Sequence, residues 1–303
     1  MIIVNTVDCK ANKRGVGVEA CIQELGQPNG FMEVDLTWST TLAAGTLNLA
    51  FFQLEMQKEN FVIFNNATGF EETTEDTVFE TFSSGQKKAV REGLVELKFQ
   101  YNNGYGWHSA ASTHQGFNNK AIVLIWDNGV FGFDESKDGT IRGLRRSYLN
   151  VKNFKNNDGA ASSNTMIEFQ LTESKAYNEK MALVNEDTLD FIINSDLKSP
   201  TEYDVNFVEA PADGDNDCKI SVLAFVNNGI FAAGLLPTDL KISGKTIATA
   251  VADSTNKYYD VTISGTFVAT ETHTAKINDG TYDVAIVGES LYKGTGKAIT
   301  VTA

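Results

Sequence analysis

Residues 133–140, with the sequence FDESKDGT, carry the residue types of a calcium loop. Counted from Asp134, the first, third and fifth positions are Asp134, Ser136 and Asp138, and the sixth is glycine. The twelfth position of such a loop is a bidentate glutamate, but here it is Arg145. The segment also follows a predicted strand, and Asp-Gly is itself a strong turn signal. We therefore interpret it as the tip of a β-hairpin and predict no metal site.

Other residue types that serve catalysis and metal binding are scattered. Residues 213–217 contain three aspartates, but the sixth and twelfth positions of that loop are cysteine and alanine, so we interpret it as an acidic interdomain loop. His108 and His114 are six residues apart and do not form a metal pair on one helix face. No GxSxG elbow, P-loop or GxGxxG after a strand is present. We predict no catalytic residue and no cofactor, and hence no enzyme.

The cysteines and the apolar segments indicate the cellular compartment in which the chain is made. Cys9, Cys21 and Cys218 are widely spaced and include no CxxC pair, which favours reduced, buried thiols over disulfides or zinc ligands. The first residues lack the basic-then-apolar order of a signal peptide. No apolar run approaches the ~20 residues of a membrane span. The sequence predicts synthesis in the cytosol and no membrane association.

The 303-residue chain is acidic, with a formal charge of −14 and a pI of about 4.7. Such a surface repels nucleic-acid phosphates, which disfavours a sequence-specific reader of nucleic acids. The polar stretch at 71–85 is typical of a mobile or partner-docking loop. Its first acidic residues are Glu71, Glu72, Glu75 and Asp76.

Basic residues gather in two places, with Lys87, Lys88 and Arg91 in the first cluster and Arg142, Arg145 and Arg146 in the second. In so acidic a chain, basic patches complement acidic patches on a neighbouring copy. The alternative is a solvated face, on which these residues form ion pairs within the chain that contribute little to the free energy of folding. We take both clusters, with the acidic residues of 71–85, as candidate contacts between copies.

A second kind of binding site is suggested by aromatic residues beside glycine and asparagine. Tyr101, Tyr105 and Trp107 lie in the segment YNNGYGWHS, a composition that suits stacking against sugars. The competing interpretation is an ordinary packed loop, because aromatic side chains most often fill cores. Carbohydrate binding therefore remains the alternative to assembly.

Strand signals dominate the elements that must position these residues. Short runs of Val, Ile, Thr and Phe are bounded by Gly, Asn and Asp. Residues 121–126, AIVLIW, predict a strand buried on both faces, and Asn128-Gly129 predicts a tight hairpin turn after it. The same design returns at 219–234. Short helices are expected at 18–26, 84–93, 107–117 and 173–184.

Two prolines and dense turn residues at 200–213 predict a domain boundary. We expect residues 1–204 to form a β-rich assembly domain, a barrel or sandwich with a few short helices. Residues 205–303 contain about seven short predicted strands, the number in an immunoglobulin-like sandwich. The predicted fold class is thus mainly β in both domains.

Three segments carry a resemblance to virion proteins. Residues 277–303, INDGTYDVAIVGESLYKGTGKAITVTA, resemble the last strands of immunoglobulin-like modules appended to phage tail and capsid proteins. Residues 84–117 and 138–154 resemble, in their general sequence character, virion proteins of tailed phages of Bacteroidota. The resemblance covers most of the chain, but its motifs are unspecific and transfer no signature residue.

The resemblance implies a structural subunit of a phage virion that assembles in the host cytoplasm. A tail-tube protein fits the layout best, because such subunits are β-barrel or β-sandwich domains that form stacked hexameric rings around a DNA channel, sometimes with an immunoglobulin-like module outside. Its partners would be copies of itself and other virion proteins. A head, collar or decoration protein is the alternative within the same class.

Overall fold

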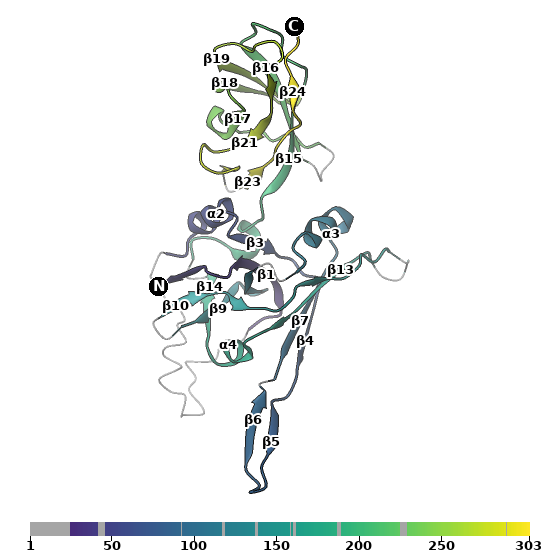
Figure 1. Cartoon of the computed structure of the whole chain (residues 1–303), viewed down its shortest axis with the longest axis vertical. Coiled ribbons are helices and arrows are strands. Elements are labelled where there is room, and N and C mark those ends of the chain that lie inside the picture. Colours follow the sequence, from purple (N-terminus) through teal and green to yellow (C-terminus); the bar gives the residue numbers. More distant parts are fainter. Residues whose placement is uncertain are drawn as a thin grey trace. The chain divides into compact units, whose positions relative to one another are not determined.

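The computed structural model describes residues 25–41, 46–91, 93–116, 119–136, 139–157, 159, 162–186, 189–224, 229–288 and 290–303. The fold is mainly β with a few short helices, as predicted (Figure 1). The chain divides into two compact units, of which the first comprises Met1–Glu55 and Glu59–Leu197 and the second Met56–Lys58 and Lys198–Ala303. The division expected at 204/205 falls inside the first long strand of the second unit.

The first unit contains two main sheets and a separate two-stranded ribbon. The larger sheet has the order β2 (Ser39–Thr41), β10 (Thr140–Arg142), β9 (Val130–Glu135), β8 (Lys120–Trp126), β1 (Pro28–Asp35) and β3 (Phe61–Phe64), with β11 (Leu144–Arg145) on β8 and β14 (Met181–Asn185) on β9. The smaller sheet has the order β12 (Asn150–Val151), β13 (Thr165–Leu171), β7 (Val95–Tyr101) and β4 (Gly69–Thr74). The ribbon is β5 (Val78–Thr81) and β6 (Lys87–Arg91). The helices are α2 (Leu49–Gln57), α3 (Gly104–Ser112), α4 (Ser174–Glu179) and α5 (Ile193–Asp196).

The main core of the first unit lies between its two sheets. Strands β7 and β13 alternate strictly between buried and half-buried residues, so one face of the smaller sheet is apolar and the other is polar. Their buried residues, such as Leu97 and Phe169, pack in one cluster with Phe31 and Leu124 of the larger sheet. This alternation is why the smaller sheet covers the core with one face only.

The larger sheet is apolar on both faces. Residues 121–126 of β8 are all buried, which confirms the prediction of a strand buried on both sides. On the face away from the smaller sheet, Phe52 of α2 stacks on Phe131 of β9 with 5.2 Å between ring centroids. Helix α2 therefore covers the second face of this sheet with aromatic packing.

The second unit is a sandwich-like arrangement of short strands. Its main sheet has the order β18 (Thr246–Asp253), β19 (Tyr258–Ser264), β16 (Asp217–Ala224), β15 (Thr201–Phe207), β23 (Ser290–Lys293) and β22 (Val284–Val287). Opposite it lie β17 (Leu240–Ile242) with β21 (Ala275–Ile277), β20 (Thr272–His273) with β24 (Ile299–Thr300), and the 3₁₀ turn η3 (Pro237–Asp239). One apolar core joins these strands, with Ile220, Val261 and Ile277 fully or almost fully buried.

The hairpin predicted after residues 121–126 forms, with one difference in turn geometry, whereas the bend predicted in the hairpin at 219–234 lies at residues 225–228, outside the described residues. Strands β8 and β9 pair antiparallel across three connecting residues, because Trp126 pairs with Val130. Gly129 has φ +72°, whereas Asn128 is not among the residues with positive φ. The turn is therefore a three-residue connection with glycine in the left-handed position, and not a two-residue turn with positive φ at both residues.

The helix predictions were right in part. The helix expected at 107–117 is α3, and the one expected at 173–184 is the shorter α4 followed by β14. The helical turns expected at 84–93 were wrong, because this segment contains β6, whose backbone pairs with β5. The helix expected at 18–26 lies almost entirely outside the described residues.

Candidate assembly surface

The most unusual element of the first unit is a long hairpin that leaves the smaller sheet. Its inner part is the antiparallel pair β4–β7, with Glu71 opposite Lys98. Beyond the sheet it continues as the two-stranded ribbon β5–β6, which Figure 1 shows extending away from the rest of the unit. We call residues 75–93 the arm. The segment 71–85 was predicted as a mobile or partner-docking loop, and the loop prediction was wrong for residues 71–74 and 78–81, which belong to the strands β4 and β5.

The arm exposes large apolar side chains. Every residue of β5 is exposed, and Phe79 is 55% accessible. Val78 and Phe82, on either side of it, are exposed as well. An isolated two-stranded hairpin is marginally stable in water, because it has no core of its own. These apolar side chains would gain the contacts that they lack if a partner surface covered them.

The two strands of the arm differ in charge. Asp76 and Glu80 are exposed on the outgoing side, and Lys87 and Lys88 are exposed on the returning strand. Glu80 lies opposite Lys88 in the ladder, yet within the described residues neither lysine makes an ion pair. Both ammonium groups are thus open to carboxylates of another molecule. Arg91 lies at the end of β6, and its side chain is outside the described part of the chain.

The acidic residues at the base of the arm make contacts within the chain. The Lys98 ammonium lies 3.3 Å from Glu71, and the Tyr177 hydroxyl donates to Glu72 at 2.9 Å. Burial and the hydrogen bond to Glu72 raise the pKa of the Tyr177 phenol well above its usual range. Glu75 also has an interaction partner within the chain. These contacts fix the base of the arm to the sheet.

The second basic cluster is not a free patch. Arg142 bonds Asp134 at 2.6 Å, and Arg145 lies 3.5 Å from Glu173. The Arg146 side chain has no exposed area and pairs with buried Glu33. The structure therefore favours the alternative of ion pairs within the chain for this cluster and leaves Lys87 and Lys88 as the open basic residues.

Arg146 belongs to a buried polar cluster that joins distant segments. Glu33 of β1 accepts a hydrogen bond from Arg146 and lies 2.7 Å from the His114 Nδ1 atom. Arg146 also donates to the carbonyl oxygens of Gly116 and Ser147. With a carboxylate and two carbonyls around it, the guanidinium positions the segment after β11 against the larger sheet. Sequence spacing gives no signal for this cluster, because Glu33 is 81 residues from His114 and 113 residues from Arg146.

The aromatic candidates for sugar binding do not form one exposed platform. Tyr101 is fully buried, donates a hydrogen bond to the Phe64 carbonyl at 3.0 Å, and has its pKa raised by burial. Trp107 packs against the Tyr101 ring at 4.6 Å. Only Tyr105, at 68% accessibility, is well exposed. The packed interpretation thus describes two of the three residues.

The two aspartate-rich loops, after Asp134 and at 213–217, make hydrogen bonds that hold the fold together. Asp134 and Glu135 end β9, and Thr140 begins β10, which pairs with β9 as the predicted hairpin. Residues 137 and 138 lie outside the described residues. In the other loop, Asp213 accepts from the Ala269 amide at 2.9 Å. Within the described residues, no group of three His, Cys, Asp or Glu side chains is placed to hold a metal ion.

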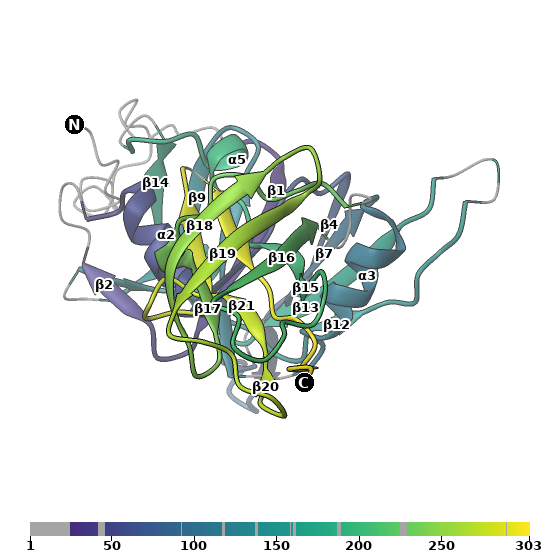
Figure 2. The same cartoon turned by 90° about the horizontal axis from the view of Figure 1, so that it is seen from above.

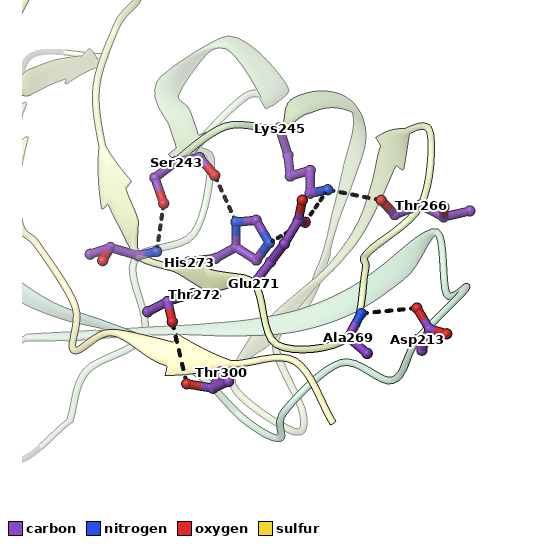
Figure 3. A network of polar contacts seen from close by, with 10 residues as sticks. Asp213, Ser243, Lys245, Thr266, Ala269, Glu271, Thr272, His273 and Thr300 are labelled. Carbon is purple, nitrogen blue, oxygen red and sulfur yellow. Dashed lines mark hydrogen bonds and ion pairs between the residues drawn. The ribbon is translucent and has the colours of Figure 1, made fainter. Parts of the chain in front are cut away.

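The second unit contains a compact network of titratable groups (Figure 3). The Lys245 ammonium bonds Glu271 at 2.7 Å, and the His273 Nε2 atom lies 3.2 Å from the same carboxylate oxygen. The hydrogen bond from Lys245 is the main cause of the lowered pKa of Glu271. His273 Nδ1 contacts the backbone oxygen of Ser243 at 2.8 Å, and the Ser243 hydroxyl accepts from the Thr274 amide.

This network has the residue types of a hydrolytic triad but not its geometry. Nucleophilic catalysis needs a histidine nitrogen within reach of the serine hydroxyl. Here the histidine contacts the carbonyl of Ser243 and not the hydroxyl. The arrangement clamps the loop after β17 to the strand β20, which is a structural role.

Cys218 is a buried free thiol, as predicted, and burial raises its pKa to about 12. Cys9 and Cys21 lie outside the described residues. Among the helices that the structure describes, none has the length and apolar character that crossing a lipid bilayer requires.

No family model matches this chain. No curated protein matches its sequence.

Proposed function

We propose that this chain is a structural subunit of a phage virion, most specifically a tail-tube protein that forms stacked homo-oligomeric rings around a DNA channel. The arm carries the proposal. It is a thin ribbon with exposed Phe79 and Phe82 and two exposed lysines that make no ion pair with the described part of the chain, and it projects from a well-packed domain. A monomer gains nothing from such an element, whereas a neighbouring subunit that covers it would bury its apolar side chains.

The charges favour another copy of the chain as that neighbour. The chain carries a formal charge of −14, so a second copy presents many carboxylates to Lys87 and Lys88. A contact between the arm of one copy and a different surface of the next is heterologous, and heterologous contacts propagate into rings or stacks. An acidic lumen would let DNA pass without binding it. Head, collar or decoration positions would use the same arm and remain the alternative within the class.

Removal of the apolar surface of the arm tests the proposal. Phe79→Ser with Phe82→Ser takes away the arm's aromatic contact area without touching the core. Tyr105→Ser is the matched control, because it removes an exposed aromatic ring elsewhere on the first unit. We expect rings or tubes in electron micrographs of the unmodified chain and of the control. The arm variant should remain folded by circular dichroism and should form no rings or tubes, so that light scattering detects nothing larger than a dimer.

Two results would contradict the proposal. One is an unmodified chain that stays monomeric at the highest concentration reached. The other is an arm variant that assembles as the unmodified chain does. Retention of glycans by a monomer, lost in the Tyr105→Ser variant, would favour the carbohydrate-binding alternative.

A further inference from the structure

Strand β18 of the second unit is an edge strand with an unprotected outer side. It is the first strand of the six-stranded sheet and pairs with β19 alone (Figure 2). Among the described residues, no hydrogen bond reaches its other side. Along these eight residues, the backbone N–H and C=O groups that point away from β19 therefore end at an open edge.

Soluble proteins protect such edges with charged side chains, prolines, bulges or very short strands. The first seven residues of β18, TIATAVA, contain no charge and no proline. A bulge does interrupt the pairing between Ile247 and Thr249, but from Thr249 to Asp253 the ladder with β19 is regular. In that regular part Val251 points away from the core and is 63% accessible. The regular part of β18, from Thr249 to Ala252, thus has none of the features that protect an edge strand from pairing with another chain.

We infer that the edge of β18 pairs with the same edge of a second copy of this chain, antiparallel and centred on Val251. A two-fold axis through Val251 sets Val251 against Val251, Ala250 against Ala252, and Thr249 against Asp253. Every pair is then apolar or an acceptor beside a hydroxyl, and no like charges meet. The one charged residue of β18, Asp253, lies opposite Thr249 in this register, and the other side chains are uncharged, so the two copies meet without like-charge repulsion.

This contact differs from the one proposed for the arm. An isologous pair closes at two copies, so it neither builds nor requires a ring. The inference stands whether or not the chain belongs to a tail tube. One strand pair is a small interface, so the dimer should be weak and should depend on protein concentration.

Crosslinking of the full chain tests the register. Val251→Cys places two thiols across the two-fold axis, and mild oxidation or a short bismaleimide should give a covalent dimer on a denaturing gel. Val268→Cys is the matched control, since Val268 is also an exposed valine of the second unit, at 49% accessibility. The unmodified chain carries the same native cysteines and sets the background. Dimer yield for Val251→Cys at or below that of Val268→Cys overturns the inference.

A charge at the edge provides a second readout. Val251→Lys places two ammonium groups at the axis and should abolish the concentration-dependent dimer in sedimentation velocity. Val268→Lys adds the same charge elsewhere and should leave the dimer unchanged. The crosslinking experiment can be repeated with Val251→Cys added to the variant Phe79→Ser with Phe82→Ser. If that protein forms no rings but still gives the covalent dimer, the contact through the arm and the contact through β18 are independent. An unaltered dimer in Val251→Lys would show that another surface holds the copies together.

Discussion

At the residue scale, the same residue type has different energetic roles depending on burial. Arg145 and Arg146 are neighbours in sequence, and both pair with a glutamate. Arg145 is 49% accessible, so water and salt screen its pair with Glu173. Arg146 and Glu33 are both withdrawn from water, so each depends on the other for compensation of its charge.

We therefore predict that replacing the two arginines by alanine lowers the stability of the fold by different amounts. Arg146→Ala removes the buried ion-pair partner of Glu33, which then retains only its contact with His114 among the side chains of this cluster, and should lower the free energy of unfolding by about 3–5 kcal/mol. Arg145→Ala should cost about 0–1 kcal/mol. Urea titrations followed by tryptophan fluorescence measure both. Equal losses for the two variants would contradict this assignment of burial.

Asp283 predicts a pH dependence in the second unit. Its pKa is lowered from the ordinary value of 3.8, first by the hydrogen bond from Lys276 and then by that from Asn278. A carboxyl group whose folded pKa is depressed stabilises the fold above its unfolded pKa and loses that contribution as the pH falls through the folded pKa.

Asp283→Asn should thus destabilise the second unit at neutral pH. The carboxylate is largely exposed, so the loss should be at most about 1 kcal/mol. The difference between variant and unmodified chain should shrink below pH 3.8 and vanish once Asp283 is protonated in both states. Thermal melts across this range by circular dichroism test it, and a difference that grows in acid would contradict the sign.

At the element scale, the base of the arm depends on a close backbone approach. Gly93 lies where the returning strand leaves β6 for β7, opposite Glu75. A Cβ atom at Gly93 would stand 1.8 Å from the Glu75 carbonyl oxygen, so the two strands would have to separate. Glycine is needed here for space and not for a positive φ.

Gly93→Ala should therefore loosen the arm and cost about 1–3 kcal/mol. Gly106→Ala is the matched control, because a Cβ there meets no atom within 4 Å and alanine favours the helix α3. The control should be neutral or stabilise by about 0.5–1 kcal/mol. Hydrogen exchange of the arm amides, together with urea unfolding, measures both effects. Unchanged protection of the arm in Gly93→Ala would contradict the steric argument.

The arm also shows where local patterns misled the prediction. The segment SGQKKAVREG has good helix formers and few β-branched residues, so propensity favoured a helix. The structure instead pairs its Lys88 with Glu80 in a ladder. The opposing strand TVFET is rich in β-formers, and the intervening Ser-Ser-Gly is a turn signal, with Gly85 at φ +79°. When the two strand-forming segments and the turn residues between them are considered together, they predict a hairpin.

At the scale of the whole molecule, two separate cores imply two unfolding events. The first unit is organised around residues such as Leu97 and Phe169, and the second around residues such as Ile220 and Val261. All three tryptophans, at positions 38, 107 and 126, lie in the first unit. Tryptophan fluorescence therefore follows the first unit alone, whereas calorimetry follows both.

Core truncations in the two units should separate these signals. Ile220→Ala creates a cavity in the second core, should cost about 2–5 kcal/mol, and should move a calorimetric transition that is silent in tryptophan fluorescence. Leu97→Ala is the counterpart in the first core and should move the fluorescence transition. A shift of the fluorescence midpoint in Ile220→Ala would show that the two units unfold as one.

The sequence alone determined the mainly-β class, the buried strand at 121–126, the hairpin that follows it and the β-rich C-terminal unit, because alternation and turn residues act over short distances. Tertiary structure decided what the charged and aromatic residues do. Arg146 and Tyr101 became buried because Glu33 and Phe64, distant in sequence, lie beside them. Lys87 and Lys88 stayed exposed because the arm leaves the sheet. Burial depends on contacts between distant segments, which no local pattern encodes.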